Sequence, residues 1–266
     1  MNQTSRRGAG TILLRDGLRA ARRTIEAARA VVSDIDGVLL VSGRATPGAR
    51  ELLEKKRCVC VSNNSTHTAE TLSEVFAAAG LSVRPQDLFL AGEAAVSFLK
   101  KRCPQEPVLA LASGDILKLA ARELSLLDPK ASHTQTPSAV LVCRDETLTF
   151  EKLQCAANAL HLGAAAIVAN PDLTHPAAGG RVHLETGAIW QALRAQCLLP
   201  QQAVVVGKPS AMLVHEAARH MGAPVQELVF LGDNLLTDAA AAQAAGMPFI
   251  HVGAGGFSLE DLLRGE

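Results

Sequence analysis

Short apolar runs alternate with amphipathic stretches along most of the chain. Strands are predicted where aliphatic and β-branched residues gather, at 30–40 (leading into a loop), 58–65, 203–209, 228–234 and 247–253. Helices are predicted between them, at 47–56, 68–80, 210–222 and 237–246. Apolar strands separated by helices are typical of βαβ units, in which helices cover both faces of a parallel sheet. The pattern therefore predicts an α/β fold with a parallel sheet.

The middle of the chain repeats this alternation. The segments PVLALAS, SAVLVCR and AAIVANP are predicted strands, and FEKLQCAANALHLG is a predicted helix between two of them. This stretch has the size of a second α/β unit inserted into the first. We predict a discontinuous core domain, 1–86 and 201–266, and an inserted domain, 87–200.

Composition narrows the class of protein. The chain has 266 residues, 48% of them hydrophobic, and 26 basic residues balance 26 acidic ones. Without a basic excess, neither nucleic acid nor an anionic membrane surface is an expected partner. A signal-peptide core and an apolar run of about 18 residues are also missing, so we predict a cytoplasmic protein. The six cysteines are too sparse for a disulfide framework.

Residues 11–30 predict an amphipathic helix with arginines on its polar face. Such a helix could lie on a membrane surface. The alternative is that it packs against its own domain, as surface helices of globular proteins do. We favour the packed helix.

Polar residues follow the predicted strands of the core. They form four clusters: Asp34 with Asp36, Ser62–Ser65, Lys208, and Asp233 with Asp238. The carboxyl ends of parallel strands meet at one crevice, which is where open α/β sheets bind ligands. We therefore expect the four clusters to lie together.

The carboxylates of these clusters point to a cation. Asp34 and Asp36 alone could form a hydrogen-bonded turn. Asp233 and Asp238 bring further negative charge to the same crevice, and carboxylates so placed repel one another unless a cation neutralises them. Oxygen ligands select a hard ion, so Mg²⁺ is the predicted cofactor.

The other two clusters favour an anion beside that cation. Ser62 and the backbone of Asn63 stand where a strand opens toward a helix, a place where hydroxyl and N–H groups bind anions. Lys208 adds a compact positive charge. Together with Mg²⁺ these groups suit a phosphoryl group.

Four segments resemble, in order, the motifs of the haloacid dehalogenase superfamily: DIDGVL (34–39), SNNS (62–65), GKP (207–209) and GDNLLTD (232–238). With the insertion between the second and third motifs, the chain is similar to the NagD-like phosphatases. The resemblance implies a three-layer Rossmann-like core with an inserted α/β cap of the C2 type. After MPFIHVG the chain ends sooner than is usual in this family.

The resemblance also implies a role for each motif residue. Asp34 would be the nucleophile and Asp36 the general acid and base. Ser62, Asn63 and Lys208 would bind the phosphoryl oxygens. Mg²⁺ would be held by Asp34, the backbone carbonyl of Asp36, and Asp233, with Asp238 in support. Dehalogenases lack the second aspartate of the first motif, so Asp36 favours phosphate esters as substrates.

The cap is expected to read the substrate. Asp172, His175 and Arg181 stand in a segment that resembles the family's specificity loop, although a polar turn between elements is the alternative. Arg181 could recognise a carboxylate or a second phosphate. Capped relatives commonly self-associate through the cap, which makes a homodimer the expected assembly.

We therefore predict Mg²⁺-dependent hydrolysis of small-molecule phosphate monoesters such as sugar phosphates, nucleotides, phosphoglycolate or pyridoxal phosphate. The alternative is a phosphoaccepting signalling module, which also uses an aspartate, Mg²⁺ and a lysine. A receiver domain of that kind is about half as long and has no inserted cap.

Overall fold

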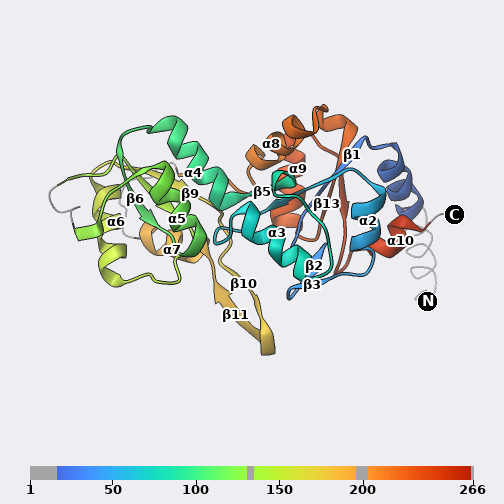
Figure 1. Ribbon diagram of the computed structural model, residues 1–266, viewed down its shortest axis with the longest axis horizontal. Helices are drawn as coiled ribbons and strands as arrows, with labels where there is room; N and C mark the ends of the chain where they lie inside the picture. Colours follow the sequence, from blue (N-terminus) through green and yellow to red (C-terminus); the bar gives the residue numbers. More distant parts are fainter. Residues whose placement is uncertain (1–16, 131–134, 196–202, 265–266) are drawn as a thin grey trace, which may run out of the picture.

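A computed structural model describes residues 17–130, 135–195 and 203–264, which form two parallel sheets side by side (Figure 1). The first sheet has the strand order β14-β13-β1-β4-β5, and every neighbouring pair is parallel. Its strands are β1 (Ala30–Ser33), β4 (Cys58–Ser62), β5 (Leu88–Leu90), β13 (Leu228–Gly232) and β14 (Phe249–His251). The parallel α/β sheet predicted from the sequence is confirmed.

Helices cover both faces of the first sheet because its strands alternate in the side they present. Val32 of β1 packs in a core cluster with α8 (Met212–Met221) and α9 (Ala240–Ala245). Val31 packs in another, with α2 (Ala49–Lys55), α3 (Ala69–Ala78) and α10 (Leu259–Leu263). This arrangement is the three-layer core that the resemblance implies.

The arginine-rich helix runs over residues 17–27 in the described part of the chain. Its Ala21 and Ile25 are buried in the core cluster that contains α10, and the Arg22 Nε donates to the Asp261 carbonyl over 2.8 Å. The helix therefore packs on its own protein, as favoured. Residues 11–16 of the predicted helix lie outside the described residues.

The second sheet has the strand order β12-β9-β8-β6-β7 and is also parallel. Its strands are β6 (Pro107–Leu111), β7 (Ser125–Leu126), β8 (Ala139–Val142), β9 (Ala165–Val168) and β12 (Val204–Val205). The apolar residues of α4 (Ala91–Arg102) and α5 (Gly114–Glu123) pack on one face, and those of α6 (Phe150–His161) and α7 (Thr186–Arg194) on the other.

One hydrophobic cluster joins the two sheets. It contains Val61 of the first sheet, Leu141 of the second, and Ala95 of α4 between them. Where α4 begins, a side chain on Gly92 would come within 3.0 Å of Ser65 and Ile116, so only glycine fits this approach. The two sheets are therefore held in contact next to the loop that follows β4.

Two strands differ in place from the prediction. β5 belongs to the first sheet, although it falls in the range predicted for the insertion. The predicted strand at 203–209 shrinks to β12, which pairs with β9 of the second sheet and not with the core. Hydrophobicity alone cannot decide this, because an apolar strand fits either parallel sheet equally well.

Shorter elements complete the described chain. Two hairpins pair β2 (Leu40–Val41) with β3 (Arg44–Ala45), and β10 (Thr174–Ala177) with β11 (Arg181–Leu184). The second hairpin projects from the body of the molecule (Figure 1). Short helical turns are η1 (Pro85–Asp87), η3 (Ala178–Gly180), η4 (Val225–Glu227) and the π-type η5 (Leu235–Ala239).

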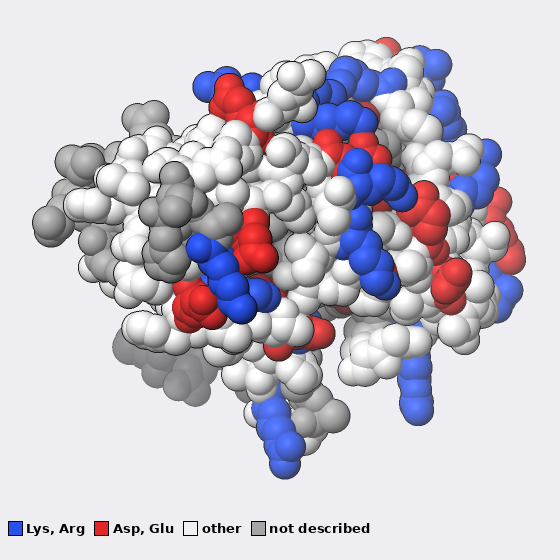
Figure 2. Space-filling view, turned by 60° about the vertical axis from the view of Figure 1, so that its left-hand side comes forward, with Lys and Arg blue, Asp and Glu red and all other residues white. Residues whose placement is uncertain are grey.

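The surface carries both charge signs. On the face shown in Figure 2, lysines and arginines lie among aspartates and glutamates. Ion pairs on the surface of the molecule include Lys55–Glu51 and Lys118–Asp115. None of the helices in the described ranges is both long and apolar enough to cross a bilayer. The described cysteines, 58, 60, 103, 143 and 155, are free thiols, and Cys197 lies outside the described residues.

Candidate active site

Three neighbouring strands of the first sheet end in the predicted polar residues. Asp34 follows β1, Ser62 is the last residue of β4, and Asp233 follows β13. Because these strands lie in the order β13-β1-β4, their carboxyl ends adjoin. The structure thus brings together three of the predicted polar clusters at one edge of the sheet.

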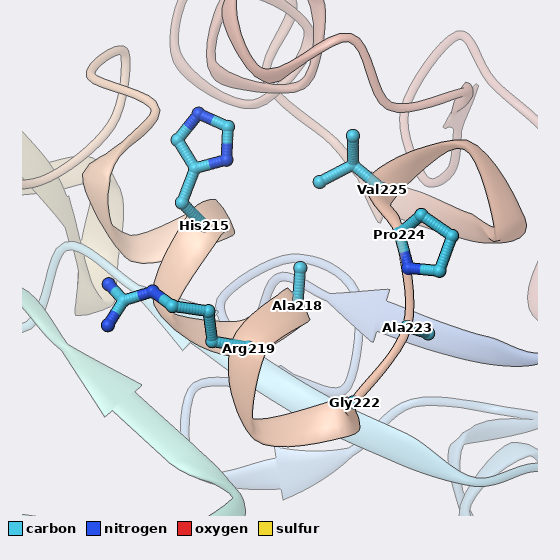
Figure 3. A pocket seen from close by; sticks show the side chains of 7 residues that line it. All are labelled: His215, Ala218, Arg219, Gly222, Ala223, Pro224 and Val225. Carbon is cyan, nitrogen blue, oxygen red and sulfur yellow. The ribbon is translucent and has the colours of Figure 1, made fainter.

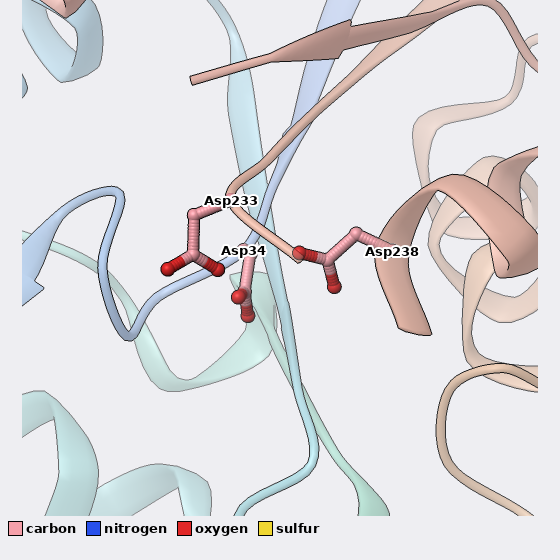
Figure 4. Close-up of side chains that lie close together, drawn as sticks. All are labelled: Asp34, Asp233 and Asp238. Atoms are coloured by element: carbon pink, nitrogen blue, oxygen red, sulfur yellow. The ribbon is translucent and has the colours of Figure 1, made fainter. Parts of the chain in front are cut away.

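Asp34, Asp233 and Asp238 form a carboxylate cluster (Figure 4). One side-chain oxygen of each lies within 4.8 Å of the others. Asp238 comes from η5, where its Oδ2 accepts a hydrogen bond of 3.0 Å from the backbone N–H of Asn234. Asp36 is not a side-chain member of the cluster.

Two glycines make this close approach possible. A Cβ on Gly37 would lie 1.9 Å from Oδ2 of Asp233, and its φ of +86° also favours glycine. A Cβ on Gly232 would lie 2.4 Å from the Cβ of Asp238. The glycines that follow Asp36 and precede Asp233 in the motifs therefore leave room for the carboxylates.

Lys208 reaches the cluster from the second sheet. It follows β12 by three residues, and its Nζ lies 2.6 Å from Oδ1 of Asp34 and 2.7 Å from Oδ1 of Asp238. The lysine side chain is only 2% exposed. Burial alone would lower the pKa of Lys208, but Asp34 and Asp238 raise it above its usual value. Lys208 therefore stays charged. The strand before it, β12, belongs to the second sheet and not, as predicted, to the core.

Burial changes the pKa values of the aspartates in the site. It raises the pKa of Asp34 well above the usual value, and the charge of Lys208 only partly opposes the rise. Burial also raises the pKa of Asp233, and neighbouring Asp238 raises it further. When all three are ionised, the carboxylates exceed the single charge of the lysine by two. The hard oxygen donors fit a divalent ion such as Mg²⁺.

Asp36 has different surroundings. Part of its side chain meets solvent, yet burial of the carboxyl still raises its pKa. The charge of Lys208 and the imidazoles of His175 and His67 oppose this rise. Asp36 is thus an acid with a raised pKa at the edge of the cluster.

The loop after β4 carries the predicted anion-binding residues. Ser62 is buried, and its Oγ accepts a hydrogen bond of 3.0 Å from the Asn64 backbone. The Asn63 Nδ2 donates to the Lys208 carbonyl (3.0 Å) and to Oδ2 of Asp172 (2.9 Å). Ser62, Asn63 and Lys208 therefore lie together beside Asp34.

The predicted cap residues separate into two groups. Asp172 meets the loop through Asn63, and burial raises the pKa of its carboxyl. His175, on β10, forms a 2.6 Å contact with Glu185. Arg181 is exposed beside the turn of the projecting hairpin. In the described chain, Asp172 and His175 are linked to the site and Arg181 has no contact with it.

Sequence reasoning missed His67, Arg144 and Glu185. His67 lies two residues past the SNNS motif, and its Nδ1 lies 3.2 Å from Nδ2 of Asn64. Arg144 and Glu185 stand 41 positions apart and meet only in the fold. No spacing rule joins them, so the sequence held no signal for the pair.

A separate surface depression lies at α8 and the turn that follows it, where His215, Arg219 and Val225 line it (Figure 3). That turn leads into the start of β13, whereas Asp233 follows its end. The depression therefore lies at the amino ends of the strands, away from the carboxylate cluster at their carboxyl ends. His215 and His220 are exposed on α8, and His220 pairs with Asp87.

Comparisons with known proteins agree with this geometry. A profile of haloacid dehalogenase-like hydrolases matches residues 31–123, and a HAD-hydrolase-like profile matches 205–266. Human chronophin is 32% identical over 258 residues, which cover 91% of this chain and 86% of chronophin. The chain belongs to the haloacid dehalogenase-like hydrolase family. The resemblance inferred from the four motifs is confirmed.

Other members of the family show the subclass. The acid sugar phosphatase of Staphylococcus aureus is 27% identical, over 88% of this chain and 90% of its own. NagD from E. coli K-12 superposes with a TM-score of 0.75 at 27% identity, covering 89% of this chain and 92% of NagD. The p-nitrophenyl phosphatase from Archaeoglobus fulgidus gives 0.76 at 27%, covering 85% and 87%. Within the haloacid dehalogenase-like hydrolases, this protein is a NagD-like phosphatase.

Proposed function

We propose that the protein hydrolyses small-molecule phosphate monoesters with Mg²⁺ through an aspartyl-phosphate intermediate. The observation that carries the proposal is the carboxylate of Asp34, held at the end of β1 between Lys208 and two further carboxylates. In this proposal Asp34 is the nucleophile, and Lys208 and the bound cation balance the charge of the phosphoryl group that it attacks.

Mg²⁺ would be held by Asp34, Asp233 and the backbone carbonyl of Asp36. Asp238, whose carboxylate binds Lys208, would support the ion. The cation supplies charge neutralisation for the carboxylates and for the phosphoryl oxygens. Ser62, the Asn63 backbone and Lys208 would bind those oxygens from the other side. The excess of negative charge in the carboxylate cluster supports this assignment.

In the first step, an oxygen of Asp34 attacks phosphorus and the bond to the leaving-group oxygen breaks. Asp36 gives its proton to that oxygen, so the product leaves as an alcohol. In the second step, Asp36 takes a proton from water, which attacks phosphorus and releases phosphate from Asp34. The raised pKa of Asp36 suits it to carry the proton between the two steps.

We also propose that the unit built on the second sheet, from α4 to β12, acts as a cap over the crevice and restricts it to small esters. The contact of Asp172 with Asn63 supports this, because it places a residue of the second half of the chain beside the site. Relatives include the acid sugar phosphatase and a glycerol phosphate phosphatase from Mycobacterium tuberculosis (TM-score 0.79, 25% identity). We propose polyol and sugar phosphates as the first esters to test.

A cytoplasmic location and a homodimer through the cap stay predictions. The exposed Val182 and Leu184 of β11 support the dimer, since apolar side chains on a projecting hairpin are suited to a protein contact. Sedimentation of the wild type and of Val182→Ser tests it. A dimer that persists unchanged in the variant would move the interface elsewhere.

The proposed function is tested by phosphate release from p-nitrophenyl phosphate and a panel of metabolite phosphates, with and without Mg²⁺. Asp34→Asn removes the nucleophile at nearly constant shape and should lower turnover by at least about 10³-fold. Asp87→Asn is the matched control, because Asp87 precedes β5 at the opposite edge of the sheet. A folded wild type that releases no phosphate but accumulates a persistent acyl phosphate would favour the phosphoaccepting module.

A further inference from the structure

Glu185 is the meeting point of three elements near the proposed site. Its Oε1 lies 2.6 Å from Nδ1 of His175 on β10 and 3.5 Å from Nη1 of Arg144. Its Oε2 accepts a hydrogen bond of 3.3 Å from the Thr186 backbone, which makes Glu185 the N-cap of α7. The glutamate side chain is 15% exposed and that of His175 is 40% exposed. The carboxylate is thus the inner partner of the pair.

This contact fixes which nitrogen of His175 carries hydrogen. A carboxylate flanked by a guanidinium accepts hydrogen bonds, so Nδ1 of His175 must be the donor. Within the described ranges, Nε2 of His175 has no hydrogen-bond partner. The ring of His183 lies 5.0 Å away across the hairpin and packs against it without such a bond. Glu185 therefore leaves Nε2 as the polar atom of His175 available to a ligand.

The surroundings place His175 on the leaving-group side of the site. Three residues before it, Asp172 accepts from Asn63 of the anion-binding loop. The backbone N–H of Arg144 donates to Oγ of Ser65 in the same loop. Thr186, the residue after Glu185, has its Oγ1 2.9 Å from Oγ of Ser65. His175 and Glu185 therefore belong to a segment that contacts the anion-binding loop from the second sheet, on the side where the part of the ester beyond the phosphoryl group would lie.

We propose that Glu185 is a positioning residue that orients His175, so that Nε2 contacts a polar atom of the substrate's leaving group. Arg144 in turn holds Glu185. The inference rests on the proposed function and adds a substrate class to it. Because neutral Nε2 accepts a hydrogen bond, the preferred esters have a hydroxyl group beyond the ester oxygen, within reach of the histidine.

A double-mutant cycle tests this coupling. Glu185→Gln keeps the length of the side chain and an oxygen for the cap of α7, but removes its charge. We expect KM for the best polyol or sugar phosphate to rise about tenfold, with kcat within about threefold, because one oriented hydrogen bond is lost. In a His175→Ala background, Glu185→Gln should add no further change. Glu146→Gln is the control, since exposed Glu146 pairs with Arg144 but not with His175.

Two-dimensional ¹H–¹⁵N spectra of the full chain give a readout that does not require turnover. At about pH 8.5, where histidine is usually neutral, we expect His175 in the Nδ1–H tautomer and a mixed population in Glu185→Gln. The His175→Ala spectrum assigns the signals.

An Nε2–H tautomer in the wild type would overturn the inference, as would an equal KM increase from Glu185→Gln with and without His175. A wild type with the Nδ1–H tautomer that hydrolyses no ester would instead count against the proposed function.

Discussion

Asp36 stands two residues past Asp34, where the chain leaves the buried end of β1. Its side chain is partly open to solvent at the edge of the site, while that of Asp34 is buried and held by Lys208. Two acids of the same chemical type therefore receive different surroundings within three residues. In the proposed reaction this separates nucleophile from proton carrier.

Asp36→Asn should change the two steps unequally. p-Nitrophenolate leaves without needing a proton, so its release should continue, whereas activation of water should slow by about 10²–10⁴-fold. We expect a burst of about one p-nitrophenolate per chain followed by slow turnover in rapid-mixing experiments.

An alkyl phosphate is the control, because its leaving group needs the proton. It should give no burst in the same variant. A uniform loss on both esters without a burst would remove Asp36 from the second step.

Lys208 is the buried counter-charge of the carboxylate cluster, and removing it should cost stability. Lys208→Met leaves Asp34 and Asp238 without their cation, so we expect the free energy of unfolding in metal-free buffer to fall by about 3 kcal/mol. Urea denaturation measures the change. Adding Asp238→Asn to Lys208→Met should restore part of it, and a double variant less stable than the single one would contradict the argument.

At the scale of elements, η1, β5 and α8 meet in a small polar cluster. Asp87 of η1 pairs with Arg84 over 2.7 Å and with Nε2 of His220 on α8 over 3.0 Å. The ring of His220 meets Phe89 of β5 edge-on. This contact holds β5, an outermost strand of the first sheet, against α8. It lies at the amino ends of the strands, whereas the proposed site lies at their carboxyl ends.

The cluster predicts a pH dependence of stability. Partial burial would raise the pKa of Asp87, but hydrogen bonds from Arg84 and His220 lower it below the ordinary value of 3.8. The ionised carboxylate therefore stabilises the fold above that pH, and the stabilisation is lost as the pH falls through the lowered pKa. In Asp87→Asn the urea midpoint should drop less between about pH 6 and about pH 2.5.

Glu54→Gln, which alters an exposed carboxylate on α2, is the control. Its pH profile should follow the wild type. Identical profiles for Asp87→Asn and the wild type would show that Asp87 contributes nothing to acid stability.

Sequence patterns foretold the elements that place the carboxylates. β1, β4 and β13 are buried apolar runs that end in polar residues, and both properties are visible in the chain. The start of the helix after Asp233 was predicted at 237, but the segment 235–239 forms a π-type turn that aims Asp238 inward. Its backbone follows from the hydrogen bond between Asn234 and Asp238, which no periodicity encodes.

Other elements left no readable pattern. All residues of β11 are exposed, so the hairpin lacks the alternation that marks a half-buried strand. The two-residue β12 is visible in the sequence as an apolar run, but the strand with which it pairs is not. The contacts of Glu185 with Arg144 and His175 depend on how α7, β8 and β10 meet, and such long-range contacts have no local signature.

At the scale of the whole molecule, Mg²⁺ should act as a stabiliser. A ligand that binds only the folded state adds about 2.7 kcal/mol to the free energy of unfolding at one hundred times its Kd. The carboxylate cluster is preformed and repels itself, so the ion should raise the thermal midpoint and EDTA should reverse the shift.

Asp233→Asn removes one of the proposed ligands and should reduce that shift, whereas Asp87→Asn should retain it. Differential scanning calorimetry at several Mg²⁺ concentrations measures both. A Mg²⁺ shift of equal size in Asp233→Asn would exclude Asp233 as a ligand.

Lys208 connects the two sheets. It follows β12, which pairs with β9 of the second sheet, and its side chain binds Asp34 at the end of a strand of the first sheet. This limits how the two halves can be exchanged in evolution or by engineering. A new insertion grafted between β5 and β12 would have to supply its own neighbour for β12, or the lysine would lose its registration with the nucleophile. Recombination at this junction would therefore alter the proposed active site together with the second sheet.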